Sequence, residues 1–372
     1  MKFKLKKSEH LNKFQVFNKI EKLKLSTREN KTVNGDSLVF KSTGQKLYIH
    51  ISNDISSAYV YLCDLDDEGV DFAVDSNLFT NAFSNFPVDE IQFSFIEEEN
   101  QLVFGNKKTR VSLKTSSLNG NSYNFEELFF INNEDIWSDL SSSNLQNAFK
   151  YSSFSCAPDF DEYPYTSIML FMNNDKFNTQ SSDKHRISIY GEKYSGEASY
   201  LISKNQAELT LFFIPKNSGK YSIHKGKLLI LWEDGGFSTA IDNNTYQSVY
   251  NTFTQFFQKS EHITNFTINK NDVLRSIKFI SSISSSHNFY IKGSGKELIF
   301  SSSNNEKGAV IDKIQLSEEI KDFEASYLVN HFTKALELLN MDEVLLSFED
   351  YNGYTICIVQ DVNYNHLMFP ME

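Results

Sequence analysis

The chain alternates between two kinds of apolar spacing. Short segments with apolar residues at every second position lead into clusters of Ser, Asp or Asn, after which apolar residues recur every three or four positions. Alternation is typical of a strand and the wider spacing of a helix, and Ser, Asp and Asn accept hydrogen bonds from free N–H groups at helix starts. The pattern occurs six times. The predicted strands are residues 3–5, 72–74, 138–140, 200–202, 266–268 and 323–325.

Six such units account for the whole chain. The gaps between successive strand starts run from 57 to 69 residues with a mean of 64, and the chain has 372 residues. A repeat of this length indicates one supersecondary unit used several times. The predicted helical stretches are 7–25, 76–86, 141–153, 203–213, 270–283 and 325–339.

Alternating segments return after each helix. In the last third, Asn352-Gly353 stands between two of them and predicts a hairpin. Each unit is therefore strand–helix–strand–strand–strand. Because one helix cannot cover both faces of such a sheet, two units are expected to share one α+β domain. The predicted domains are residues 1–122, 123–259 and 260–372.

The composition is that of a globular protein, with 40% hydrophobic residues, 15 Gly and 5 Pro. No apolar run approaches the roughly 18 residues that a membrane-spanning helix needs, and no signal segment follows the basic start. The three cysteines, Cys63, Cys156 and Cys357, are widely spaced in apolar contexts. They are interpreted as reduced core residues, so a cytoplasmic protein without a membrane contact is expected, in a bacterium or an infected host cell.

The charge is unevenly distributed. The net charge of −12 argues against a protein that holds nucleic acid by its overall field. The six predicted helical stretches nevertheless contain eleven basic and five acidic residues, a net charge of +6, which leaves −18 for the rest. Basic helices in an acidic protein suit a surface that attracts DNA while the exterior repels it. The alternative is an ordinary set of solvated helix faces.

Three local sequences resemble one known family. They are Met1-Lys2-Phe3 with Glu9-His10-Leu11, the run from Ser182 to Ile187 (SDKHRI), and the ending from His366 to Glu372 (HLMFPME). Together with three domains built from six units, they resemble the β sliding clamp of bacterial DNA polymerase III over the whole chain. The Asn-, Ser- and Phe-rich composition suggests a divergent version, encoded by a bacterium or by a virus.

The resemblance implies a head-to-tail homodimer whose six domains close into a ring around duplex DNA, with helices inside and sheets outside. It implies a replicative polymerase and a clamp loader as partners, and no cofactor. Tyr163 and Tyr165 stand where the family has paired tyrosines on a DNA-contacting loop, although a turn around Pro164 explains them nearly as well. The other residues expected to face DNA are Lys7, Lys13, Lys19, Lys24, Lys150, Lys204, Lys270, Arg275 and Lys278.

The resemblance also implies a pocket that accepts short peptides from partner proteins. Without it, the C-terminal ending would be interpreted as a strand end packed in its own core, and His185 as a turn histidine. Four positions depart from the family and predict a different peptide preference: Lys184 replaces a Gly, and Gln247, Asn251 and Glu372 replace a Pro and two Arg. The implied pocket residues are His185, Arg186, Ile187, Leu367, Met368, Phe369, Pro370 and Met371.

The sequence offers no residues for catalysis. The run Asp64-x-Asp66-x-Glu68 lacks the closing Glu of an EF-hand and is interpreted as an acidic turn. Gly293-Ser294-Gly295-Lys296 fails the phosphate-loop spacing and predicts a hairpin turn between residues 289–292 and 297–300. No His-Glu-x-x-His, Cys-x-x-Cys or Gly-x-Ser-x-Gly sequence occurs. A non-enzymatic protein without a metal is therefore expected.

Three functions remain open on this basis. The first is a sliding clamp that serves as a processivity factor in DNA replication. The second is a clamp-like adaptor that binds the same kind of peptide without encircling DNA, for example in viral transcription. The third is an unrelated β-rich enzyme or binding module in which the repeat is accidental.

Overall fold

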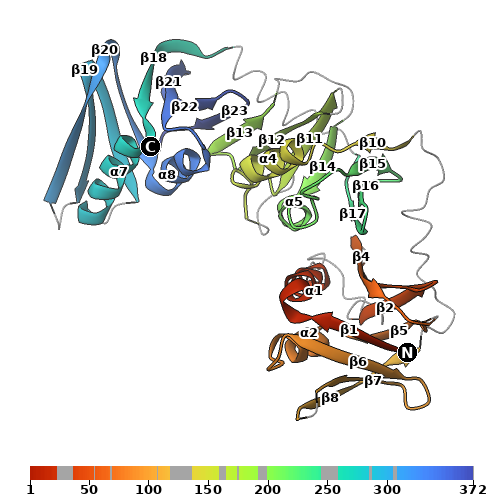
Figure 1. Ribbon diagram of the computed structural model, residues 1–372. Helices are drawn as coiled ribbons and strands as arrows, with labels where there is room; N and C mark the ends of the chain where they lie inside the picture. Colours follow the sequence, from red (N-terminus) through yellow and green to blue (C-terminus); the bar gives the residue numbers. More distant parts are fainter. Residues whose placement is uncertain are drawn as a thin grey trace. The chain divides into compact units, whose positions relative to one another are not determined.

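The computed structural model has a mixed α+β fold, as the pattern of apolar residues predicted (Figure 1). Contacts divide the chain into two compact units, Met1–Leu145 with Asn205–Asp242 and Gln146–Lys204 with Asn243–Glu372. The three predicted domains stay a prediction, because each unit combines segments from two of them. The structure describes residues 1–22, 37–53, 55–67, 69–106, 108–117, 136–158, 165–173, 176–191, 199–243, 259–284, 287–304 and 308–371.

All six predicted helices are confirmed within these residues, and each follows a strand. The helices are α1 (Lys7–Lys22), α2 (Ser76–Ser84), α4 (Ser142–Ser153), α5 (Lys204–Thr210), α7 (Lys270–Ser284) and α8 (Val329–Leu338).

The first unit contains two antiparallel sheets. The smaller one has the order β1 (Lys2–Lys6), β6 (Glu90–Ile96), β7 (Gln101–Gly105), β8 (Arg110–Lys114). The larger one has the order β10 (Ser138–Asp139), β15 (Lys220–His224), β16 (Lys227–Trp232), β17 (Gly235–Ala240), β4 (Ser56–Asp64), β3 (Lys46–Ser52), β2 (Ser37–Thr43), β5 (Phe72–Asp75), β9 (Ser116–Ser117).

The second unit contains an eight-stranded sheet and a separate pair of long strands. The eight-stranded sheet has the order β14 (Ser199–Ser203), β11 (Ser167–Asn173), β12 (Lys176–Ser182), β13 (Arg186–Tyr190), β23 (Tyr364–Met368), β22 (Tyr354–Asp361), β21 (Glu343–Tyr351), β18 (Glu261–Asn269). The long pair is β19 (Asn288–Asn304) and β20 (Gly308–Leu328).

Strand β19 folds back on itself. The rings of Phe289 and Phe300 lie 6.1 Å apart, whereas eleven residues of extended strand would separate them by about 36 Å. Gly295, with φ +58°, lies at the reversal, where only a residue without a Cβ turns freely. The predicted hairpin turn at Gly293–Lys296 is therefore confirmed.

The two ends of β20 consequently lie on opposite sides of the folded β19. Its residues 323–328 pair with residues 288–293, and residues 308–315 pair with residues 297–304. The resulting order matches β5-β2-β3-β4 and β14-β11-β12-β13. In chain order, the third strand after the first helix is β4 in the first third of the chain and β13 in the middle third. In the last third it is the first part of β20.

Backbone hydrogen bonds follow the same threefold repeat. Each joins the residue directly after a strand (β1, β10 or β18) to the residue directly before its partner strand (β6, β15 or β21). The bonds run from Lys7 N to Asp89 O (2.8 Å), from Leu140 N to Gly219 O (2.8 Å), and from Lys270 N to Asp342 O (2.7 Å).

Two of these residues are lysines, and their side chains also donate hydrogen bonds to the C-terminal end of a helix from the second half of the same third of the chain. Lys7 Nζ donates to the carbonyl of Phe86 at 2.7 Å, just beyond α2, and Lys270 Nζ donates to the carbonyl of Leu339 at 2.7 Å, just beyond α8. A cation there satisfies free carbonyls and complements the negative end of the helix dipole. The middle third has the buried Leu140 at the same place.

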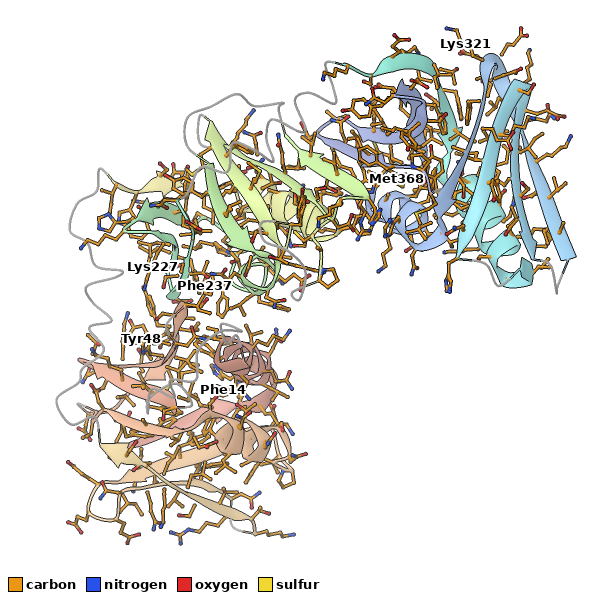
Figure 2. The ribbon with its side chains drawn as sticks, turned by 180° about the vertical axis from the view of Figure 1, so that it is seen from behind. Phe14, Tyr48, Lys227, Phe237, Lys321 and Met368 are labelled. Carbon is orange, nitrogen blue, oxygen red and sulfur yellow. The ribbon has the colours of Figure 1, made fainter. Side chains whose placement is uncertain are left out.

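A cluster of phenylalanines forms the core of the first unit between its helices and the smaller sheet. Phe14 of α1, labelled in Figure 2, contacts Phe79 and Phe83 of α2 edge to face, with centroids 4.9 and 4.8 Å apart. In the smaller sheet, Phe93 of β6 stacks on Phe104 of β7 at 4.9 Å. All five are fully buried, so this layer accounts for part of the phenylalanine-rich composition.

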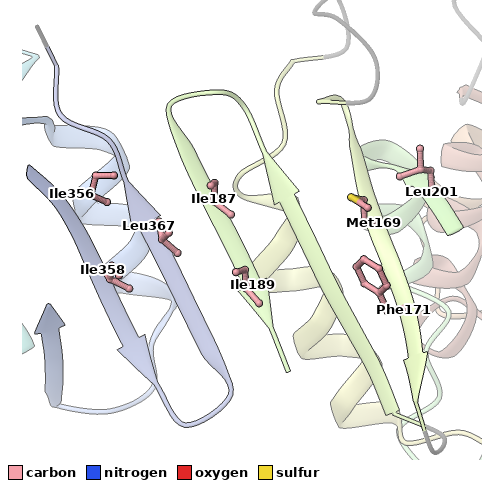
Figure 3. Close-up of a cluster of buried hydrophobic side chains, with 8 residues drawn as sticks. All are labelled: Met169, Phe171, Ile187, Ile189, Leu201, Ile356, Ile358 and Leu367. Carbon is pink, nitrogen blue, oxygen red and sulfur yellow. The ribbon is translucent and has the colours of Figure 1, made fainter. Parts of the chain in front are cut away.

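Two strand pairings join segments that are far apart in the sequence. In the first unit β17 pairs with β4 in antiparallel register, from Gly235 opposite Val60 to Thr239 opposite Ser56. In the second unit β23 pairs with β13 in the same sense. A cluster of eight buried apolar side chains covers one face of that sheet (Figure 3). Each pairing joins the last strand of one third of the chain (β17 or β23) to a strand of the preceding third (β4 or β13). Both β4 and β13 are the third strand after the first helix of their own part of the chain.

Candidate peptide-docking pocket and helix surface

A short, rigid turn connects β12 to β13. The hydroxyl of Ser182 accepts from the N–H of Lys184 (3.1 Å) and donates to the carbonyl of Arg186 (2.9 Å). Asp183 Oδ1 accepts from the N–H groups of His185 and Arg186 at 3.1 Å each, and its Oδ2 accepts from Arg186 Nε at 2.7 Å. These bonds fix the directions in which Lys184 and His185 project.

The C-terminal residues are tied to this turn and to β20. The N–H of Phe369 donates to the carbonyl of His185 at 3.0 Å, and the N–H of Met371 donates to the carbonyl of Ser326 at 2.8 Å. Pro370 between them has no N–H to place. The tail is therefore held extended by alternate backbone bonds.

The turn and the tail enclose a pocket with a volume of about 390 Å³. That size is at the lower end of the range for small-ligand sites and fits a few side chains. Its walls combine apolar and aromatic side chains with two basic residues, which suits an extended peptide with apolar anchors. The lining residues are Lys184, His185, Tyr354, Phe369, Pro370 and Met371.

Four of the residues that the resemblance implied for this pocket line it: His185, Phe369, Pro370 and Met371. Arg186 lies beside them, in its ion pair with Asp183. The other three, Ile187, Leu367 and Met368, are at most 3% exposed. Ile187 and Leu367 belong to the core cluster of Figure 3. For these three residues the structure matches the alternative interpretation, a strand end packed in its own core.

Two lining residues were not among the predicted pocket residues. Tyr354 is 49% exposed and begins β22, directly after the Asn352-Gly353 turn. The Asn352-Gly353 hairpin signal indicated that the next strand starts at the surface. It did not indicate that the β12–β13 turn and the C-terminal tail lie beside that strand. Lys184 stood out in the sequence only as a departure from the family, and the structure places it on the rim of the pocket.

A buried histidine lies on β23, next to the pocket-forming tail. His366 is fully buried, with Nδ1 2.9 Å from Ser188 Oγ and 3.4 Å from Ser155 Oγ. Burial, and then the charge of Arg186, lower the pKa of His366 well below its usual value. His331 of α8 is half-buried, and burial followed by the charge of Arg186 lowers its pKa to about 4. Both side chains are therefore neutral at neutral pH.

The lysines expected to face DNA in the first unit are not equally accessible. Lys13 is half-buried, and burial lowers its pKa. Lys19 is exposed, with Nζ 3.7 Å from the ring centre of Phe212. Lys7, as described, donates to a helix-end carbonyl. Lys24 lies outside the described residues. Lys19 is thus the strongest candidate for a phosphate contact in this group.

The basic residues on the helices of the second unit divide in the same way. Lys150 of α4 is exposed. Arg275 pairs with Asp272 at 3.3 Å, and Lys278 pairs with Glu337 of α8 at 3.0 Å. All four side chains in these two pairs are at least 45% exposed, so such pairs exchange readily with solvent or phosphate. Lys204 begins α5 and is half-buried, and Lys270 donates to a helix-end carbonyl.

Of the two tyrosines assigned to a DNA-contacting loop, only Tyr165 belongs to the described residues. Lys184 Nζ lies 4.9 Å from its ring centre, so Tyr165 neighbours the pocket that Lys184 lines. Tyr163 lies outside the described residues, as do Gln247, Asn251 and Glu372.

No cluster of three or more His, Cys, Asp or Glu able to hold a metal occurs in the described part of the chain. Cys156 and Cys357 are buried and Cys63 is half-buried, all as free thiols. None of the helices in the described ranges is both long and apolar enough to cross a membrane.

Solved structures match this chain from end to end. A putative DNA polymerase III β subunit from Eubacterium rectale is 15% identical, with a TM-score of 0.79, and the match covers 100% of this chain and 99% of that one. The chain has the sliding-clamp fold. The β subunit of Thermotoga maritima DNA polymerase III (14% identity, TM-score 0.80) and a Pseudomonas aeruginosa sliding clamp bound to griselimycin (12%, 0.82) match with the same coverage.

At identities of 12–15% the likeness to these clamps establishes the fold alone. No protein-family model and no curated protein sequence matches the chain.

Proposed function

We propose that this chain is a sliding clamp: two copies close head to tail around duplex DNA and tether a replicative polymerase to it. The protein would act by enclosure and by docking partners, without catalysing a reaction. In this proposal the three domains predicted from the sequence (1–122, 123–259 and 260–372) each contribute one sixth of the ring. The site of action is the cytoplasm of a bacterium or of an infected host cell, where a clamp loader would open the ring.

The proposal depends on the regular pairing between strands of successive thirds of the chain. This pairing rule leaves two strand edges without a partner strand in the described residues. Within the chain, β17 pairs with β4 and β23 pairs with β13. By the threefold repeat, β8 is the equivalent of β17 and β23, and the first part of β20 is the equivalent of β4 and β13. In the described residues, β8 pairs with β7 alone.

The side chains of β8 show what such an edge lacks. Along β8 exposed residues alternate with half-buried ones, among them Val111 and Leu113, whereas β17 and β23 are almost wholly buried. On the first part of β20, Val310 and Ile314 are likewise half-buried. An edge strand with apolar side chains readily pairs with another chain. Two such pairings, related by a twofold axis, would close a ring of two copies.

The exposed helix faces suit a loose hold on DNA. Neutral amide and hydroxyl groups can donate to phosphates without releasing counterions, so they add little salt-dependent affinity. A ring that holds DNA by enclosure needs no tight phosphate contacts. The exposed neutral residues on the helices include Ser8, Asn12, Gln15, Asn81, Ser143, Gln146, Asn271, Ser282 and Asn330, beside the cations Lys19, Lys150, Arg275, Lys278 and Lys334.

A threading experiment tests enclosure without a loader. The protein is incubated with linear duplex DNA carrying biotin at both ends, streptavidin is added to block the ends, and the complex is washed with 0.5 M salt. Retention is expected when the ends are blocked after the protein is added, and not when they are blocked before. The adaptor alternative predicts no difference between the two orders, and that result would exclude the ring.

Charge reversal at Lys150, Arg275 and Lys278 provides a variant for the same assay. Threading is expected to slow several-fold, because the cations attract DNA during encounter. The lifetime of complexes already trapped should stay unchanged, because enclosure does not depend on charge. A shortened lifetime would mean that the protein holds DNA by contact.

The pocket is proposed to dock partner proteins through short peptide segments. Removing residues 369–372 deletes three of the six lining residues and the backbone bonds that hold the tail. The truncated protein is expected to lose partner binding by at least tenfold while it still forms dimers and threads onto DNA. Pull-down with a polymerase, beside the threading assay, measures both. Undiminished binding would place the docking site elsewhere.

A further inference from the structure

The hairpin formed by β15 and β16 is basic in an otherwise acidic protein. Residues 209–232 contain four lysines and one histidine and no Asp or Glu, whereas the whole chain has a net charge of −12. Lys216, Lys220 and Lys225 are exposed, and Lys227 is half-buried. Asp139 lies opposite Lys220 on β10, yet in the part of the chain that the structure describes none of the four lysines takes part in a salt bridge. Their charges are therefore available to a ligand.

The register of the strands places these charges on the face of the sheet that points away from the helices. Phe237 of β17 stacks at 4.5 Å on Phe213, three residues after α5, so it marks the helix side. Side chains alternate along a strand, and the pairing of β16 with β17 puts Lys227 and Leu231 on the opposite face from Phe237. Figure 2 labels both Lys227 and Phe237. Lys220 lies opposite Leu231 and shares its face. The hairpin lysines are thus separate from the helix lysines proposed to contact DNA.

The same hairpin adjoins a backbone contact that repeats the frame of the C-terminal pocket. In the pocket, the N–H of Phe369 donates to the carbonyl of His185 at 3.0 Å. In the first unit, the N–H of Ala240 donates to the carbonyl of Ile55 at 2.8 Å. Each bond joins the end of a last strand, β23 or β17, to the residue directly before a third strand, β13 or β4. Because Lys227 lies opposite Ala240, the hairpin stands beside this second frame.

The two frames also have equivalent hairpin turns with different side chains. Asn352-Gly353, with φ of +54° and +85°, precedes Tyr354, and Lys225-Gly226, with φ of +49° and +72°, precedes Lys227. A turn of this kind needs a positive φ at both positions and favours Asn at the first, so a lysine there is costly. The second frame therefore has two cations where the first has an amide and an aromatic ring.

We propose that the β15–β16 hairpin is a second docking site, which binds an acidic segment of a partner protein. Carboxylates of that segment would accept hydrogen bonds from the ammonium groups of Lys220, Lys225 and Lys227. Charge complementarity selects this occupant, because a protein with a net charge of −12 repels acidic chains elsewhere on its surface. The site goes beyond the proposed clamp function, since it needs neither the C-terminal pocket nor a closed ring.

The probe is a fluorescent nonapeptide in which Glu and Ser alternate, and its neutral counterpart has Gln in place of every Glu. Binding to the full-length protein is measured by fluorescence anisotropy at two salt concentrations. At 50 mM salt the Glu peptide is expected to bind at least about tenfold tighter than the Gln peptide, as for a few exposed ion pairs acting together. At 300 mM salt the preference should shrink, because salt screens exposed charges.

Charge reversal on the hairpin isolates the lysines. K220E/K225E should abolish the preference for the Glu peptide. K296E/K321E is the matched control, because it changes the net charge equally at two exposed lysines in the last third of the chain, and it should keep the preference. K225N is a milder variant: it removes one charge and installs the favoured Asn-Gly turn, so it should weaken Glu-peptide binding while it keeps or raises the melting temperature.

The outcomes separate this site from the proposed clamp function. Removing residues 369–372 should leave Glu-peptide binding unchanged, and K220E/K225E should still thread onto DNA. Equal binding of the Glu and Gln peptides, or a preference that survives K220E/K225E, would overturn the proposal. A nine-residue oligothymidylate is tested in parallel. If it binds more tightly than the Glu peptide and loses that binding in K220E/K225E, the hairpin is a nucleic-acid site and the assignment to an acidic protein segment is wrong.

Discussion

Aspartate substitutions at Leu113 or at Ile314 are each expected to convert the proposed dimer into monomers. Leu113 lies on β8 and Ile314 on the first part of β20, the two edges that the internal pairing rule leaves without a partner. A carboxylate at an apolar interface costs about 3 kcal/mol when it is desolvated. A closed ring contains two such interfaces, so the dissociation constant should rise by about four orders of magnitude.

Sedimentation velocity over a range of concentrations measures this change. Circular dichroism of the same samples should show unaltered secondary structure, which separates lost association from lost folding. V362D is the matched control, because Val362 is 86% exposed in the turn between β22 and β23 and belongs to neither edge. Dimers of wild-type strength in both edge variants would contradict the ring.

Acidification is expected to destabilise the second unit through His366, which is buried, and His331, which is half-buried. An unfolded histidine takes up a proton near pH 6.5, whereas burial keeps His366 neutral to a much lower pH and holds the pKa of His331 near 4. Between these values the unfolded state binds more protons than the folded state. Stability is therefore full above about pH 6.5 and falls as the pH drops, by up to about 1.4 kcal/mol per pH unit for each histidine.

Urea unfolding at pH 7.5, 6.0 and 5.0, followed by circular dichroism, measures this slope. H366Q removes one titrating group and should reduce the slope by up to about 1.4 kcal/mol per pH unit, whatever its own stability at pH 7.5. Equal slopes for H366Q and the wild-type protein would show that His366 does not titrate on unfolding.

The fold was predictable because its elements repeat a pattern with a physical cause. Apolar residues at every second position indicate a strand, and apolar residues at every third or fourth position indicate a helix. Because this change occurs six times at similar gaps, an ambiguous local pattern matters less. The predicted turn at Gly293–Lys296 was also correct, because glycine allows the backbone to reverse. These signals are local, so the sequence displays them directly.

The site was less predictable because its features depend on contacts between distant residues. Whether Leu367 lines a pocket or a core depends on which face of β23 it occupies, and apolar residues occur on both faces, Leu367 on one and Met368 on the other. Lys7 and Lys270 resemble exposed helix lysines in sequence, and only the approach of a second helix end shows their other role. Tyr354 lines the pocket together with the C-terminal tail, which begins fifteen residues later at Phe369.

The pairing of β17 with β4 and of β23 with β13 has a mechanical consequence for a closed ring. All six joints would have the same antiparallel hydrogen bonds, but a covalent backbone spans only four of them. Force applied anywhere on the circumference would therefore part it first at the contacts between copies, so those contacts would serve as its gate.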